Sequence, residues 1–284
     1  LTAALYAPSL RFGFIWDDPI WYERVAGPSI WALLGPQPDV HFYRPATLAL
    51  IRLFARADGT FPAVPMHGFQ IGVHLITTLL AAQLARRLGF VRWRELPAFA
   101  ALFALYPLGH QAVVWTAPQQ PWVMLASFAV LHLYLSARRR PALLAPALLA
   151  FLLALAIQEN AIVVLPFLFL LEWQRRGSFR AMLRSPAPWA FVTLGGAYLM
   201  LWAAMPKAAG ITELAFDPQV GLYLLQGLAW PLLGASPWIA ALLAAAAIVV
   251  GLGVARRPWL AAWSLGWIAG QLLSEGRLPL YQVG

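Results

Sequence analysis

The sequence contains no cysteine, and only 11% of its residues are charged. Without cysteine the chain forms no disulfide and offers no thiolate to a metal. A soluble domain carries about 25% charged residues, so the low charge excludes an ordinary soluble domain. Acidic residues are scarce too, 11 against 20 Lys and Arg, which leaves a net charge of +9. Because no basic and aromatic nucleic-acid-binding module is present, this excess indicates membrane topology and not nucleic-acid binding.

Apolar residues make up 61% of the chain, and the mean hydropathy is +0.69. The 14 Trp and 8 Tyr suit the aromatic belts at the two membrane surfaces. These features predict an all-α fold, a polytopic transmembrane helical bundle of about nine spans, since about 20 apolar residues cross a bilayer. The predicted spans are Leu1–Ile15 (incomplete), Met66–Leu84, Leu96–Trp115, Trp122–Ser136, Leu143–Ile157, Ala161–Leu171, Pro188–Met205, Trp238–Val254 and Trp259–Leu273. The apolar stretch Val220–Leu233 is predicted to be re-entrant or to lie on the surface.

Arginine clusters alternate with the predicted spans and set the topology. They all fall on one side, which the positive-inside bias makes cytoplasmic. The clusters are Arg86, Arg87, Arg92 and Arg94; Arg138 to Arg140; Arg175, Arg176, Arg180 and Arg184; and Arg256 with Arg257. Every acid except Glu95 and Glu172 falls on the other side. Either outer loops simply tolerate acids, or the acids mark an outward-facing cavity. The sequence predicts a multi-pass protein of a bacterial cytoplasmic membrane, with its site facing the periplasm or exterior.

The longest stretch that does not span is the outer loop, residues 16–65. Ser29 is predicted to cap a short helix that begins at Ile30. Pro45 is predicted to open a helix that runs to about Ala57, because its missing N–H costs nothing at the first helical position. Arg52 and Arg56 would then share one face of this helix, which suits a helix along the membrane surface. The loop is therefore expected to carry juxtamembrane helices.

Adjacent carboxylates, Asp17 and Asp18, directly follow the first apolar run. They can act as a base or a cation site, or simply mark the membrane boundary. Glu159 lies at the tip of a predicted hairpin of short helices, where a carboxylate needs a partner. It either pairs with an arginine or lines a substrate cavity. Arg44 and Arg277 could hold a phosphate through their planar forks of donors.

Histidines form the second group of candidates. His67, Gln70 and His74 are spaced to line one helix face. His-Gln-His is a poor zinc set, so hydrogen bonding between helices is favoured over a metal. His110 ends the third predicted span, as a helix stop and packing contact or as part of a site. Glu275 follows the last span on the outer side.

Six segments of the chain form a recognisable series. They are Phe14-Ile15-Trp16-Asp17-Asp18-Pro19, Phe42-Tyr43-Arg44-Pro45, His67-x-x-Gln70-x-x-x-His74, Leu105-Tyr106-Pro107-Leu108-Gly109-His110-Gln111-Ala112-Val113-Val114-Trp115, Gln158-Glu159-Asn160 with Pro166, and Glu275-x-Arg277-Leu278-Pro279. Together these segments resemble the GT-C membrane glycosyltransferases, in particular the branch of protein O-mannosyltransferases and tetratricopeptide-linked O-mannosyltransferases. Gln70, Tyr106, Gln111 and Gln158 depart from the family pattern.

The resemblance implies a single GT-C-like domain over residues 1–284 that continues beyond both ends. It implies inverting transfer of a sugar from a polyprenyl-phosphate donor to a hydroxyl of a protein, lipid or glycan on the outer face. Asp17 would be the base and Asp18 its support. Donor and phosphate contacts would come from Arg44, Glu159, Arg277, Glu275, His67, His74 and His110.

No cofactor or metal is required on this route, although two acids do not exclude a divalent ion. The expected partners are the lipid-linked sugar and the acceptor, with no nucleic acid, and the sequence leaves the oligomeric state unknown. Two alternatives stay open: a transporter or flippase for a lipid-linked or anionic solute, and an inactive scaffold of the same architecture.

Overall fold

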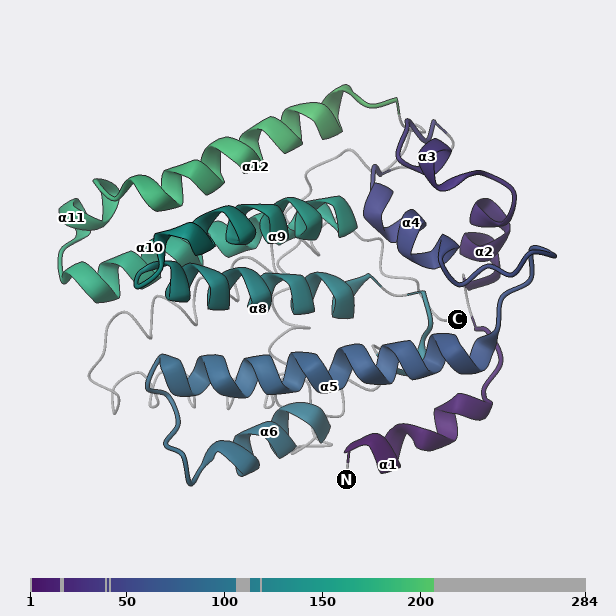
Figure 1. Ribbon diagram of the computed structural model, residues 1–284, viewed down its shortest axis with the longest axis horizontal. Helices are drawn as coiled ribbons and strands as arrows, with labels where there is room; N and C mark the ends of the chain where they lie inside the picture. The colour runs from purple at the N-terminus through teal and green to yellow at the C-terminus, as the bar shows by residue number, and fades with distance from the viewer. Residues whose placement is uncertain are drawn as a thin grey trace, which may run out of the picture. The chain divides into compact units, whose positions relative to one another are not determined.

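The structure is a computed structural model, and it describes residues 2–15, 18–38, 40, 42–105, 113–117 and 119–206 (Figure 1). Over these residues the chain forms helices and no strand, as the all-α prediction requires. Three helices in this part are long and apolar enough to cross a membrane: α5 (Ala63–Arg87), α8 (Gln120–Ala137) and α12 (Pro186–Ala204). The predicted spans at 238–254 and 259–273 lie outside the described residues, so the count of nine remains a prediction.

The chain divides into two compact units. One contains Leu1–Ile162 and Trp189–Ala208, and the other contains Val163–Pro188 and Ala209–Gly284. The expectation of a single domain stays a prediction, and each unit is considered by itself.

The N-terminal segment is not one regular helix. Helix α1 (Thr2–Tyr6) passes into the 3-10 helix η1 (Ala7–Arg11), with Pro8 in its first turn. Proline has no N–H to donate along an α-helix, so the predicted α-helical run over Leu1–Ile15 is wrong in this part. The backbone from Phe12 to Ile15 is already non-helical.

Three short helices follow in the outer loop: α2 (Asp18–Ala26), α3 (Ile30–Leu33) and α4 (Pro45–Arg52). The predicted Ser29 cap is confirmed, because the Ser29 side chain accepts a hydrogen bond of 3.2 Å from the Ala32 N–H. Pro45 stands in the first turn of α4, which is also as predicted.

Helix α4 ends at Arg52, five residues earlier than predicted. The chain turns instead through Gly59, whose φ of +80° favours glycine. Arg56 lies in that turn and its N–H donates to the Thr60 carbonyl, so the shared helical face of Arg52 and Arg56 is wrong. In the same turn the Thr60 hydroxyl and N–H both donate to Asp58. These hydrogen bonds lower the pKa of the Asp58 carboxyl.

The helices of the first unit include α5, α6 (Leu96–Leu105), α8, α9 (Leu144–Ile157) and most of α12. Helices α5 and α8 run parallel: Gln70 bonds Trp122 near their starts, and Arg87 bonds His132 near their ends. Helix α9 is preceded by a 3-10 turn, η3 (Pro141–Leu143), and packs on α8. Of the predicted span Leu96–Trp115, α6 covers Leu96–Leu105, and residues 106–112 lie outside the described residues.

The second unit contains α10 (Val164–Arg176) and α11 (Phe179–Leu183). The 3-10 helix η4 (Glu159–Val163) leads into α10, and Gly177 ends α10 in the left-handed conformation with a φ of +68°. Glycine adopts this conformation without the steric cost of a Cβ, which sets the sharp turn between α10 and α11.

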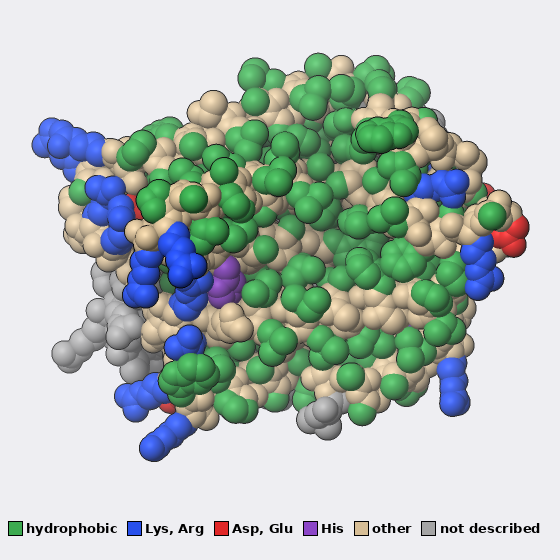
Figure 2. Space-filling view, in the orientation of Figure 1, with side chains coloured by type: hydrophobic (Ala, Val, Ile, Leu, Met, Phe, Trp, Pro, Cys, Tyr) green, Lys and Arg blue, Asp and Glu red, His purple; other side chains and the backbone are tan. Residues whose placement is uncertain are grey.

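The two ends of the helices of the first unit differ in their charged residues. Asp18 and Glu159 lie where α5 and α8 begin, as their hydrogen bonds below establish. Arg86, Arg87 and Arg138 to Arg140 lie where these helices end. Figure 2 shows apolar side chains across the helices and several arginine side chains gathered at that end of α5 and α8. Since α5 has 25 residues, the two ends are about 37 Å apart.

Hydrogen bonds of His132 and Arg87 join α5 to α8 near their arginine-rich ends. His132 Nε2 lies 2.9 Å from the Leu80 carbonyl, which can only accept, so Nε2 carries the proton. Nδ1 then accepts from Arg87 at 3.0 Å, and Arg87 also donates to Ser136. The imidazole is therefore neutral and joins α5 to α8.

Gly195 and Gly196 in α12 provide a matched test of the packing of the first unit. A Cβ at Gly195 would lie 2.7 Å from Ile162 Cδ1 and 3.4 Å from Phe151 Cε1, whereas one at Gly196 meets nothing within 4 Å. We expect Gly196→Ala to raise the free energy of unfolding by about 0.5–1 kcal/mol. Gly195→Ala should lower it by about 1 kcal/mol, because Ile162 must move. Equal shifts of the two variants in thermal unfolding would contradict this packing.

Candidate functional site

Asp18 is completely buried at the start of α2. Its Oδ1 accepts from the Ala117 N–H at 2.8 Å, and its Oδ2 accepts from the Thr116 hydroxyl at 2.8 Å and from the Ile15 N–H at 3.0 Å. A carboxylate in the first turn of a helix is also favoured by the helix dipole. Asp18 is therefore fixed as an acceptor that joins the outer loop to residues 116 and 117.

Thr116 is the meeting point of this polar network. Its hydroxyl donates to Asp18 and contacts the Tyr22 hydroxyl, and its carbonyl accepts from Gln70 Nε2 at 3.0 Å. Gln70 Oε1 in turn accepts from the indole N–H of Trp122 at 2.9 Å. Outer loop, α5 and the start of α8 are thus held by one set of buried hydrogen bonds.

Arg44 and Glu159 form a two-pronged ion pair across 115 positions of sequence. Arg44 Nε donates to Oε2 at 2.9 Å and Nη2 donates to Oε1 at 2.7 Å. The third nitrogen, Nη1, donates to Gln119 Oε1 at 2.9 Å, and the guanidinium lies 4.2 Å above the Phe42 ring. Both charged side chains are mostly shielded, with 14% and 27% of their surfaces exposed. Bidentate geometry and shielding make this a strong, directional pair.

Asp18 and the Arg44–Glu159 pair belong to one connected network. Gln119 donates to the Ala117 carbonyl at 3.3 Å, and Ala117 donates to Asp18. The path from Asp18 to Glu159 therefore runs through residues 117 and 119 of the connection before α8. We call residues 18, 44, 116, 117, 119 and 159 the acidic-end network.

Neighbouring hydrogen bonds fix the backbone on both sides of Arg44. The Tyr43 hydroxyl donates to the Leu34 carbonyl at 2.8 Å, and the Tyr43 carbonyl accepts from Tyr198 of α12. Thr47 donates to the Ile157 carbonyl at 2.8 Å. Burial raises the pKa of the Tyr43 hydroxyl, so this group remains a neutral donor.

His67, Gln70 and His74 differ in their hydrogen bonding. Gln70 and His74 have partners, and His67 has none among the described residues. Gln70 and His74 bond across helices, His74 to the Ala104 carbonyl at 3.0 Å. His67 is completely buried, yet neither ring nitrogen has a hydrogen-bond partner among the described residues; its ring meets Phe12 edge-on. No group of three or more potential metal ligands occurs in this part of the chain.

Two further buried acceptors without partners flank Glu159. They are Gln158 Oε1 and Asn160 Oδ1, which receive no hydrogen bond within the described ranges. Buried polar atoms are nearly always satisfied, so these oxygens and the His67 nitrogens are exceptions among the described residues.

Four predicted site residues lie outside the described residues: Asp17, His110, Glu275 and Arg277. Of the other predicted residues, the structure joins Asp18, Arg44 and Glu159 in one network and leaves His67 and His74 apart from it. Thr116 and Gln119 were not predicted from the sequence. Their signal was the polar break Thr116-Ala117-Pro118-Gln119-Gln120 between two apolar runs.

No protein-family model, curated protein or solved structure matches the chain.

A double-mutant cycle tests the Arg44–Glu159 pair. Arg44→Ala and Glu159→Ala should each destabilise the protein, and the double variant should cost less than their sum. The expected coupling is about 1–3 kcal/mol, because each single variant leaves one shielded charge without its partner. Unfolding in detergent measures the three variants. Additive effects would mean that the two side chains do not interact.

Proposed function

We propose that the protein is a membrane glycosyltransferase, which moves a sugar from a polyprenyl-phosphate donor to an acceptor hydroxyl with inversion at the anomeric carbon. The observation that carries the proposal is the acidic-end network. It connects Asp18 of the first loop, Arg44 and Glu159, three residues drawn from separate segments that resemble the GT-C motifs. Such a network, at the end of α5 and α8 opposite Arg86, Arg87 and Arg138 to Arg140, is what a single outward site needs.

Asp17 is the proposed base. Its neighbours Ile15 and Asp18 exchange two hydrogen bonds of 3.0 Å, from the Asp18 N–H to the Ile15 carbonyl and from the Ile15 N–H to Asp18 Oδ2. Asp18 is already fixed as an acceptor, so the adjacent carboxylate is the one left for chemistry. The described residues on either side are thus held to each other, which suits a base at position 17.

In the proposed reaction the Asp17 carboxylate takes the proton of the acceptor hydroxyl. The acceptor oxygen then forms a bond to the anomeric carbon as the bond from that carbon to the phosphate oxygen breaks. The electron pair leaves with the polyprenyl phosphate. Arg277 would offset the growing phosphate charge, and so would the N–H groups of Arg44 that Glu159 and Gln119 do not use.

One feature of the first unit supports a lipid-linked sugar as donor. An apolar groove of about 390 Å³ opens there, in the size range of ligand pockets. Its lining residues are Leu5, Tyr6, Pro8, Ser9, Phe12, Leu105 and Val114. Phe12 links this groove to the buried ring of His67.

A second candidate is an inactive scaffold of the same architecture. This candidate is favoured because all three nitrogens of Arg44 already donate to Glu159 or Gln119. In this reading the network only holds the helices together.

Reconstitution separates the two candidates. The full chain in liposomes is supplied with a panel of polyprenyl-phosphate hexoses that carry a radiolabel in the sugar, together with peptide, lipid and glycan acceptors. The proposal expects transfer from at least one donor, with inverted configuration in the product. Correctly folded protein that transfers from no donor in the panel supports the scaffold and overturns the enzyme.

A further inference from the structure

The turn between α10 and α11 concentrates positive charge in the second unit. Residues 172–185 contain four arginines, Arg175, Arg176, Arg180 and Arg184, against the single acid Glu172, a net charge of +3. All four arginines are exposed. We call these four residues the arginine platform.

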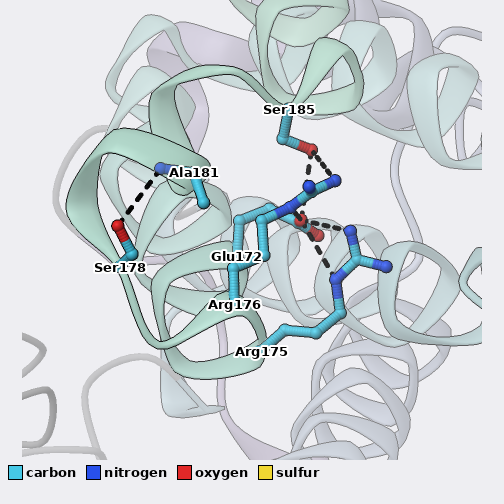
Figure 3. A network of polar contacts seen from close by, with 6 residues as sticks. All are labelled: Glu172, Arg175, Arg176, Ser178, Ala181 and Ser185. Atoms are coloured by element: carbon cyan, nitrogen blue, oxygen red, sulfur yellow. Dashed lines mark hydrogen bonds and ion pairs between the residues drawn. The ribbon is translucent and has the colours of Figure 1, made fainter.

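Glu172 holds two arginines of the platform in place. It is 3% exposed, and its Oε2 accepts from Arg175 Nη2 at 2.6 Å and from Arg176 Nε at 3.0 Å. Ser185 donates to the same oxygen and accepts from Arg176 Nη2 (Figure 3). One carboxylate thus orients two guanidinium groups. Glu172, Arg175 and Arg176 together keep a net positive charge.

The Nη1 groups of Arg175 and Arg176 have no acceptor among the described residues, and neither do the guanidinium groups of Arg180 and Arg184. A guanidinium has five N–H donors in a rigid fork. The platform therefore presents several oriented donors and unneutralised charges on its surface.

Helix α11 adds an apolar face beside these charges. Ser178 caps the helix through the Ala181 N–H (Figure 3), and Met182 is buried, which fixes how the helix is rotated. Phe179 and Leu183 lie one turn apart and are 59% and 41% exposed. Arg180 and Arg184 follow each of them by one position, so the cations line one edge of the apolar pair.

We propose that the arginine platform binds the phosphate of an acidic phospholipid headgroup, with Phe179 and Leu183 against the acyl chains. Charge complementarity selects an anion, and the adjacent exposed apolar pair selects an anion attached to hydrocarbon over a free phosphate. Trp173, which meets Phe179 edge-on at 6.2 Å, suits the same interface. This site does not depend on the proposed glycosyl transfer.

Lipid titration of the purified full chain in detergent tests the site, with native mass spectrometry counting bound lipids. Phosphatidylglycerol should bind more tightly than phosphatidylcholine with the same chains. Arg180→Gln with Arg184→Gln should weaken phosphatidylglycerol binding about 25-fold, because each arginine near an anionic surface contributes roughly fivefold. The Lys/Lys double variant at these positions keeps both charges and should stay within a few-fold of the unmodified chain.

The matched control is Arg139→Gln with Arg140→Gln, two exposed arginines of another cluster that make no ion pair with an acid among the described residues. It should leave the affinity unchanged. If both double Gln variants weakened phosphatidylglycerol binding equally, the effect would come from total charge and not from this site, and the proposal would be overturned. Equal affinity for the two lipids, or competition by glycerol phosphate alone at the same concentration as the lipid, would overturn it as well.

Discussion

Replacing Asp17 by Asn is expected to reduce sugar transfer by about 10²–10⁴-fold, the range that a positioned general base contributes. The amide keeps the size of the carboxylate and cannot take the proton of the acceptor hydroxyl. Because the substitution changes neither the size nor the shape of the side chain, the unfolding temperature should change little. The measurement is initial transfer rate in liposomes alongside thermal unfolding of the same preparation.

Asp58→Asn is the matched control for this substitution. Asp58 is another outer-loop carboxylate, and it is engaged with Thr60. Both hydrogen bonds go to Oδ1, and the amide oxygen of asparagine can still accept them, so activity should stay within about twofold. Full activity of the Asp17 variant would remove the proposed base, and with it the mechanism given above.

Replacing Asp18 by Ala is expected to lower the free energy of unfolding by about 3–5 kcal/mol. The change leaves the N–H groups of Ala117 and Ile15 and the Thr116 hydroxyl buried without their acceptor. The unfolding temperature in detergent should fall by about 10 °C. Transfer measured well below that temperature should fall far less than in the Asp17 variant, since Asp18 positions the segment and does not touch the substrate.

Glu23→Ala provides the comparison for this second prediction. It removes an exposed carboxylate from the same helix α2, so it should shift the free energy of unfolding by no more than about 0.5 kcal/mol. If the Asp18 variant were as stable as the Glu23 variant, Asp18 could not hold the outer loop to the connection before α8.

The sequence predicted the long helices well, because long apolar runs bounded by arginine or proline leave little choice. Helices α5, α8 and α12 each begin and end within about three residues of the predicted spans. The Ser29 cap was also predictable, since a capping side chain acts on a backbone N–H only three positions away. Local chemistry of this kind is visible in one sequence.

Prediction failed where the deciding contact is distant or depends on fine backbone geometry. Asp18 and Glu159 were recognised as residues that matter, yet nothing in the sequence paired Arg44 with Glu159, 115 positions away. Thr116 was overlooked because a neutral hydroxyl between two apolar runs looks like an ordinary loop residue. The early end of α4 follows from the turn at Gly59. The four-residue spacing of Arg52 and Arg56 wrongly favoured a continuing helix.

The short connection before α8 has a consequence for how this protein can diverge. Thr116, Ala117 and Gln119 serve the first loop and the Arg44–Glu159 pair at once, so a substitution there perturbs two remote places together. Drift at position 119 should therefore be accepted mainly alongside compensating replacements at 44 or 159. Among homologous proteins, the residues at positions 44, 119 and 159 should therefore covary.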